Sequence, residues 1–215
     1  PNVNWYEEGT RNFSEHNQFN VMMRGGGKRV RYMALLDYKN KFGLLNEDYT
    51  HYSDRYNSQI RTYELGLRMN LDVDITSSTQ MKFGLYGIIG EDKRPNTDIN
   101  TIFQNFYKVP AAAFPVKTLN NNWGSNTLFK MNPIAAIADV GYVQENRRML
   151  ETDMRITQDF SMFLKGLSAE VAVAYDNTAT FQDIGSKTYK YEVGYLSEEG
   201  LPVSETYGTD SKVQI

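Results

Sequence analysis

One stretch of this chain, Tyr63 to Asp74, alternates large apolar and polar side chains along its whole length. The odd positions from 63 to 73 hold Tyr, Leu, Leu, Met, Leu and Val, whereas the even positions from 64 to 74 hold charged residues, Asn and Gly. Because successive side chains of a strand point to opposite faces, the pattern predicts a β-strand with one apolar and one polar face. Such a strand separates two different environments.

The same alternation recurs elsewhere, and the alternating segments form three pairs, each joined by a short turn. We expect six strands, at residues 16–24, 30–40, 61–74, 79–90, 147–157 and 167–177. We expect short turns near 25–28, 75–78 and 158–165, and long loops at 41–60, 91–145 and from 177 onward. This rhythm is typical of outer-membrane β-barrels, whose strands alternate lipid-facing and lumen-facing residues and whose periplasmic turns are short.

The expected fold class is therefore all-β: an antiparallel transmembrane β-barrel segment with long extracellular loops. A mean hydropathy of -0.55 excludes a helical membrane protein, but a barrel needs apolar residues only at alternate positions. The 215 residues would supply only about six to eight spanning strands. An open sheet in lipid leaves unpaired edges at several kcal/mol per group, so we expect the remaining barrel strands to come from sequence beyond this segment.

Charge and composition narrow the functional classes. The net charge is -3 and no Lys or Arg run occurs, which argues against nucleic acid as a partner. The chain has no Cys, so it has neither a disulfide framework nor a thiolate metal site. His16 and His51 lack ligand spacing, and the neighbouring Glu198 and Glu199 would point in opposite directions on a strand. We expect no catalytic site, no metal and no cofactor.

The polar faces of the expected strands supply the first set of candidate functional residues. In a barrel these side chains would line the wet interior. The candidate lumen-facing residues are Glu64, Arg68, Asn70, Asp72, Lys82, Glu151, Asp153 and Arg155.

The loop at 91–145 supplies the second set, because loops of this length are normally functional or disordered. Apolar spacing predicts a short amphipathic helix at 97–108, before Pro110. Trp123 lies among asparagines and could stack on a sugar ring; we favour a contact within the loop or with a partner protein, since Trp often anchors interfaces. The candidate contacts to a partner or cargo are Phe106, Tyr107, Phe114, Asn121, Asn122 and Trp123.

Four segments in sequence order carry a family resemblance. They are Asn4–Tyr6, the run GGGKRVRYMALLDYKNKFG at 25–43, Arg68–Asp72, and the pair Asn132-Pro133 ahead of Gly141-Tyr142. Their order and spacing over about residues 1 to 160 resemble the start of the barrel in the SusC/RagA family of TonB-dependent outer-membrane transporters. Residues 180–215 carry no part of the resemblance.

The resemblance implies a fold and a function. The fold would be the N-terminal part of a 22-stranded barrel, with the plug domain and the TonB-contacting segment outside these residues. The function would be TonB-dependent import of oligosaccharide or peptide across the outer membrane of a Gram-negative bacterium. The implied partners are a SusD-like surface lipoprotein, TonB and outer-membrane lipid.

Two alternatives remain open. A soluble or surface-attached β-rich binding module, such as an adhesin, would require the apolar faces to meet in one protein core. A structural barrel without transport activity would lack only the plug and the TonB segment.

Overall fold

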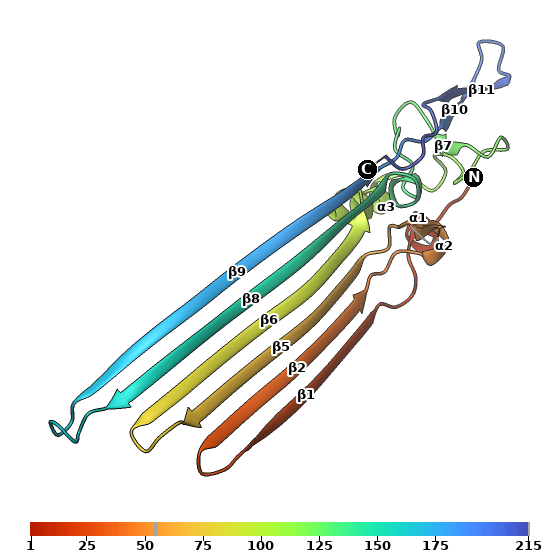
Figure 1. Ribbon diagram of the computed structural model, residues 1–215. Coiled ribbons are helices and arrows are strands. Elements are labelled where there is room, and N and C mark those ends of the chain that lie inside the picture. The colour runs from red at the N-terminus through yellow and green to blue at the C-terminus, as the bar shows by residue number, and fades with distance from the viewer. Residues whose placement is uncertain (54–55, 215) are drawn as a thin grey trace.

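The computed structural model describes residues 1–53 and 56–214, so Asp54 and Arg55 of the predicted 41–60 loop lie outside the described residues, as does Ile215. Six long strands form one antiparallel sheet in sequence order (Figure 1). They are β1 (Glu15–Gly26), β2 (Val30–Phe42), β5 (Arg61–Asp74), β6 (Thr79–Pro95), β8 (Gly141–Asp159) and β9 (Ser168–Ser186). The predicted all-β, antiparallel class is confirmed at this level. No closed barrel is present within the described residues, because β1 and β9 each have one neighbour.

The register brings the apolar sides of all six strands onto one face of the sheet. Residues directly opposite each other in an antiparallel pair share a face. One row of opposite residues reads Met23, Ala34, Met69, Leu85, Thr152 and Tyr175. The next row towards the turns reads Gly25, Tyr32, Leu71, Phe83, Met154 and Val173. We call this side of the sheet the apolar face and the opposite side the polar face.

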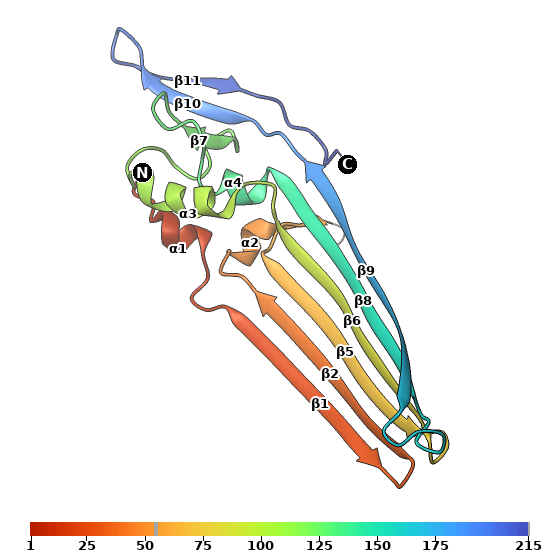
Figure 2. The ribbon, with the colours of Figure 1, turned by 90° about the vertical axis from the view of Figure 1, so that its left-hand side faces the viewer.

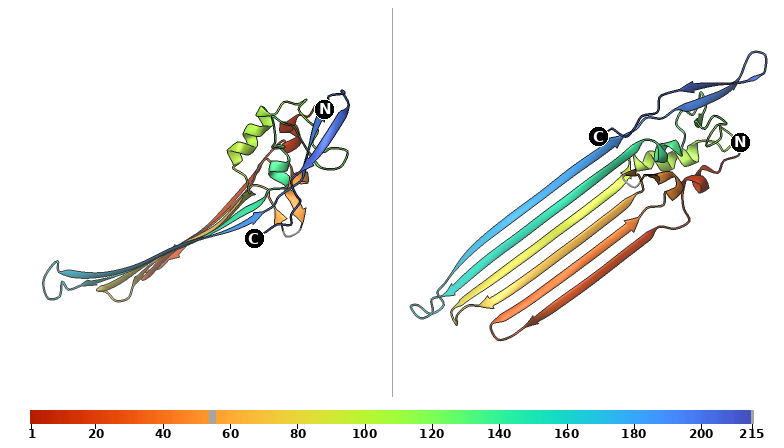
Figure 3. Two further views of the ribbon diagram at one scale, coloured as in Figure 1. Left: turned by 90° about the horizontal axis from the view of Figure 1, so that it is seen from above. Right: turned by 45° about the vertical axis from the view of Figure 1, so that its right-hand side comes forward.

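The two ends of the sheet differ. The short turns at 27–29, 75–78 and 160–167 all lie at one end, and the long connections lie at the other (Figure 1). Viewed from above, the sheet is a single curved layer with folded structure at one end only (Figure 3). Gly25 and Gly26 belong to β1 and not to the first turn, because they pair with Tyr32 and Arg31.

The long connections and the N-terminal segment fold together into a unit that we call the cap, residues 1–14, 43–53, 56–60, 96–140 and 187–214 (Figure 2). Its helices are α1 (Trp5–Gly9), α2 (Glu47–Thr50), α3 (Ile99–Lys108) and α4 (Ala135–Ala138). Its strands are β3 (His51–Ser53), β4 (Tyr56–Asn57), β7 (Trp123–Ser125), β10 (Tyr191–Leu196) and β11 (Pro202–Tyr207). β10 pairs with β11 antiparallel and with β7 parallel.

The hydrophobic core lies in the cap and not against the sheet. Its members are Trp5, Leu45, Ile102, Phe106, Val109, Phe114, Trp123, Ile134, Ala135, Ile137 and Ala138. The polar composition of residues 1–15 predicts an irregular segment, but Asn4 caps α1 and Trp5 is buried. The Trp5 indole donates to the Pro110 carbonyl at 3.2 Å, and its ring lies 5.3 Å from that of Phe114. The N-terminal segment is therefore part of the core.

Three strands extend further towards the cap than their alternation predicts. β6 continues to Pro95 instead of residue 90, β8 begins at Gly141 instead of 147, and β9 continues to Ser186 instead of 177. In these extensions polar residues such as Lys93, Gln144 and Asp183 interrupt the apolar face, although Tyr142 and Phe181 also lie on it. The regular alternation is lost there, whereas the hydrogen-bonded ladder continues.

Candidate functional site

The eight candidate lumen-facing residues all lie on the polar face. Three rows of opposite residues contain seven of them. These rows read Arg68, Tyr86, Glu151; then Asn70, Gly84, Asp153; then Asp72, Lys82, Arg155. Glu64 lies on the same face nearer the cap, opposite Gly90, which is itself opposite Arg147. Period-two spacing places them there, because alternate residues of a strand lie on the same face of the sheet.

Glu64 links three strands of this face. Its carboxylate accepts from Lys39 of β2 at 3.1 Å and from Arg147 of β8 at 2.9 Å. β6 runs between Glu64 and Arg147, and the residue it contributes to that row is Gly90. A glycine has no side chain to separate the two charges, so the guanidinium can cross the intervening strand. No local sequence pattern identifies Lys39 and Arg147 as site residues, since their partner Glu64 is distant in sequence.

A second glycine opens a hollow of about 300 Å³ in the middle of the polar face. Gly84 stands between Asn70 and Asp153, and a Cβ at Gly84 would lie 2.4 Å from Asp153 Oδ1. The wall also includes Arg68, whose guanidinium lies 4.7 Å from the centroid of the Tyr86 ring. The other charged residues of the wall are Glu151 and Asp176. Carboxylates outnumber cations here, so the hollow suits hydrogen-bond donors such as hydroxyl, amine or guanidinium groups.

The cap places the second candidate set differently from what the sequence predicts. Phe106, Phe114 and Trp123 are 5%, 3% and 4% exposed, so they are core residues of the cap and present no surface to a partner or cargo. For Phe106 the reason is the amphipathic helix α3: Ile102 and Phe106 face inward, whereas Tyr107, one position further on, is 74% exposed. Tyr107 keeps its place among the candidate contacts.

Trp123 has its polar atom and one ring face occupied. Its indole nitrogen donates to Asp139 Oδ2 at 2.7 Å, and Lys117 Nζ lies 3.4 Å from the ring centroid. Asp139 also pairs with Lys187, the residue that follows β9. The ring therefore stabilises the cap and is not free to stack on a sugar.

The asparagines beside Trp123 surround a buried carboxylate. Glu192 of β10 is 5% exposed and accepts from Thr118 at 2.6 Å and from the amides of Asn120 and Asn122 at 3.2 Å each. Hydrogen bonds from Ser204 and Thr118, together with those amides, lower the pKa of Glu192 to about 2. Asn122 is thus a structural donor. Asn121, with φ +61°, forms the turn of this loop.

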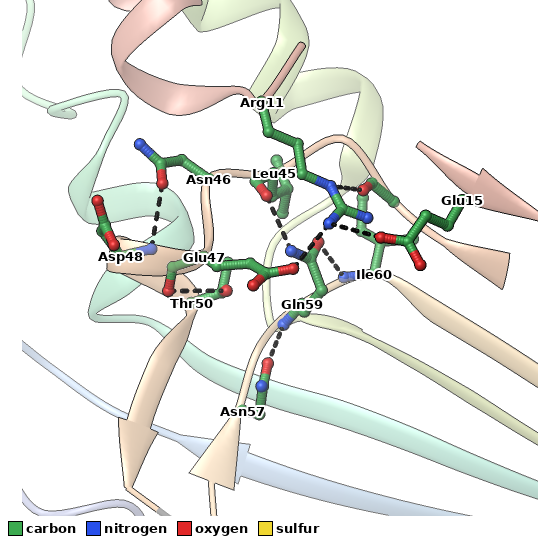
Figure 4. A network of polar contacts seen from close by, with 11 residues as sticks. Arg11, Glu15, Leu45, Asn46, Glu47, Asp48, Thr50, Asn57, Gln59 and Ile60 are labelled. Atoms are coloured by element: carbon green, nitrogen blue, oxygen red, sulfur yellow. Dashed lines mark hydrogen bonds and ion pairs between the residues drawn. The ribbon is translucent and has the colours of Figure 1, made fainter. Parts of the chain in front are cut away.

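A further polar network joins the N-terminal segment to the connection between β2 and β5 (Figure 4). Arg11 donates to the Gly43 carbonyl at 2.9 Å and pairs with Glu47 at 2.7 Å and Glu15 at 3.7 Å. Gln59 donates to the Leu45 carbonyl at 2.8 Å. These bonds orient the cap at the ends of β1 and β2.

Within residues 1–53 and 56–214, no group of three or more His, Asp or Glu side chains is arranged to hold a metal ion. His16 lies in β1 and His51 in β3, which belong to different sheets. None of the described helices has the length and apolar character needed to span a membrane.

Comparison with known proteins finds no matching family model and no matching curated protein. The candidate site therefore rests on the geometry of the sheet and cap.

Proposed function

We propose that the chain forms six neighbouring strands in the wall of an outer-membrane β-barrel that imports nutrients in the manner of TonB-dependent transporters. One observation carries the proposal: the sheet has an apolar face and a charged face in continuous register, and within the described chain neither face is covered by a second layer. Lipid on one side and water on the other is the environment that such a sheet requires.

The extent of uncovered apolar surface supports this reading. Large side chains of the apolar face are exposed on every strand. They are Phe19, Val21, Met23, Val30, Tyr32, Leu36, Leu67, Met69, Ile89, Leu150, Met154, Ile156, Val171, Val173 and Tyr175. Burying each such side chain is worth about 1.5–3 kcal/mol, and patches of this kind mark interaction or membrane surfaces. Lipid contact would bury them all at once.

The height of the apolar band also fits a bilayer. On β5 it runs from Tyr63 to Val73, roughly eleven residues, close to the 9–11 residues of a tilted spanning strand. Towards the cap the band ends at charged residues, Arg61 on β5 and Arg148 on β8. Tyr38 and Tyr63 pack edge to face, 5.6 Å between centroids, near that boundary. Aromatic girdles occupy this level in outer-membrane barrels.

The polar face would then line the lumen, and the cap would lie outside the cell. The hollow around Gly84 offers carboxylates and an amide to a plug segment or to cargo rich in hydroxyl or amino groups. A SusD-like lipoprotein would rest on the cap, where Tyr107, Leu119 and Leu128 are exposed. Coupling to TonB, and oligosaccharide or peptide as cargo, follow from the family resemblance alone.

A soluble or surface-attached binding module is the second candidate, because the cap has a core of its own. The two functions differ in what happens to the apolar face. A membrane wall requires detergent for extraction and partitions into the detergent phase, whereas an adhesin domain stays in buffer. Partition of the protein as encoded by its gene, between a detergent phase and buffer, distinguishes the two candidate functions.

Neighbouring substitutions on β5 test the proposal directly. Leu67→Arg places a charge on the apolar face, at an expected cost of about 2–4 kcal/mol near the bilayer midplane. Arg68→Ala removes a charge from the polar face and is expected to be milder. We expect heat-stable, membrane-inserted protein to fall strongly for Leu67→Arg and little for Arg68→Ala. Equal yields of inserted protein would contradict the assignment of faces.

A further inference from the structure

The turn between β8 and β9 differs from the other two short turns. Residues 160–167 read FSMFLKGL, and Met162, Phe163 and Leu164 are 86%, 76% and 65% exposed. The turns at 27–29 and 75–78 together carry one large apolar residue, Ile75. All three turns lie at the end of the sheet away from the cap (Figure 3). One hairpin of the three therefore has an apolar tip.

Hydrogen bonds hold this tip in a defined shape. The amides of Phe163 and Leu164 donate to the Phe160 carbonyl at 2.8 and 3.2 Å, and the Phe160 amide donates to the Leu167 carbonyl at 2.9 Å. Asp159 accepts from the Ser161 amide at 2.7 Å, and Gly166, with φ +85°, reverses the chain. The exposed apolar side chains are thus presented by an ordered turn, and ordered apolar surface needs something to cover it.

The tip continues the apolar face of the sheet. Phe160 and Leu167 form the next opposite pair after Asp159 and Ser168, so they share the face of Ile156 and Val171. Lys165 is the one charged residue of the turn. Apolar and aromatic residues followed by a single Lys are typical of segments that enter the membrane interface, where the Lys side chain reaches the headgroups.

We propose that residues 160–167 anchor the wall in the membrane interface on the side away from the cap, with Met162, Phe163 and Leu164 in contact with lipid and Lys165 at the lipid phosphates. The inference rests on the proposed function. Continuity with the apolar face selects lipid as the occupant, because Phe160 and Leu167 lie on the same face as Ile156 and Val171, with the single row of Gln158 and Ala169 between the two pairs. The turns with Lys28, Arg29 and Ser77 would remain in water.

Single cysteines test the anchor, since the chain has none of its own. Nitroxide labels are placed separately at Met162 and Phe163, at Ser77 as the water control and at Val173 as the lipid control. The protein as encoded by its gene is reconstituted in phosphatidylethanolamine–phosphatidylglycerol vesicles. Collision of each label with dissolved oxygen and with a water-soluble nickel chelate is then measured. We expect the oxygen-to-nickel ratio at 162 and 163 to exceed that at 77 several-fold and to approach that at 173.

The outcomes separate the anchor from the proposed function. If the labels at 162 and 163 behave like the label at 77 while the label at 173 is in lipid, the tip is in water. The anchor is then wrong, but the proposal of a membrane wall is unaffected. If 162 and 163 are immobile and shielded from both reagents, a protein covers the tip and the anchor is again wrong. If 173 is itself in water, the proposed function fails and the anchor fails with it. Labels at two positions guard against local disruption by either one.

Discussion

Gly141 occupies a position that only glycine tolerates. It begins β8 with φ +91°, and a Cβ there would stand 1.8 Å from the Gly185 carbonyl oxygen of β9. The Gly141 carbonyl accepts a hydrogen bond from the backbone N–H of Asn96 at 3.1 Å. A left-handed backbone conformation and a close approach of two strands therefore coincide at one residue, where the sheet meets the cap.

Gly141→Ala is expected to destabilise the protein by at least about 1–3 kcal/mol, from backbone strain alone. The clash with Gly185 adds to that, because backbone atoms must shift. Gly194→Ala is the matched control, since a Cβ at Gly194 in β10 meets no atom within 4 Å. The stability of both variants is measured in detergent as the urea concentration at the midpoint of unfolding. A midpoint for Gly141→Ala equal to that of Gly194→Ala would contradict this account.

For individual residues, the sequence predicts which face of the sheet they occupy better than whether they are buried. Arg68 and Asp153 are placed on the polar face by period-two spacing, which depends on nothing beyond the strand itself. Phe114 and Trp123 enter a core with Trp5, whose position more than a hundred residues away no local pattern records. The same limit hides Glu192, whose partners Thr118 and Asn122 lie about seventy residues earlier.

Among the elements, the six strands of the main sheet were predictable in number and parity, but the cap-side ends of β6, β8 and β9 and the short strands of the cap were not. Alternation reports a change of environment across the sheet, and it weakens where polar residues occupy the apolar face. The helix at 97–108 was predictable because its signal is local: α3 spans Ile99–Lys108, and Asp98 caps it by accepting from the Thr101 amide at 2.8 Å.

Glu192 links two elements of the cap, and its titration gives a pH dependence. Its pKa is about 2 in the folded protein against an ordinary 4.5, so its stabilising contribution is complete above pH 4.5 and is lost as the pH falls towards 2. We expect the fluorescence of the two tryptophans, both in the cap, to change over that window. Glu192→Gln should lose this transition, whereas Glu199→Gln, in the exposed turn before β11, should keep it. A transition unaltered in Glu192→Gln would assign the pH dependence to another group.

The asymmetry of the whole molecule predicts its orientation. If the cap is extracellular, an epitope tag in the β10–β11 turn at Glu199 is expected to label on intact cells, and a tag at Ser77 is expected to label only after permeabilisation. Asn121 is a poorer tag site, since its neighbours bind Glu192. Surface labelling at Ser77 and not at Glu199 would reverse the topology while leaving the sheet unchanged.

The order of strands in the main sheet, β1-β2-β5-β6-β8-β9, is also their order along the chain. Each strand therefore pairs with the preceding strand of the same sheet, and contacts between strands that are further apart in the sheet are not needed to begin it. Closing a loop costs about 0.6 kcal/mol more for each doubling of its length, so the three hairpins with short turns are the least costly pairs to form. Assembly can then proceed hairpin by hairpin from β1 towards β9. The unpaired edge strand of each completed hairpin supplies the backbone hydrogen-bonding groups with which the next hairpin pairs.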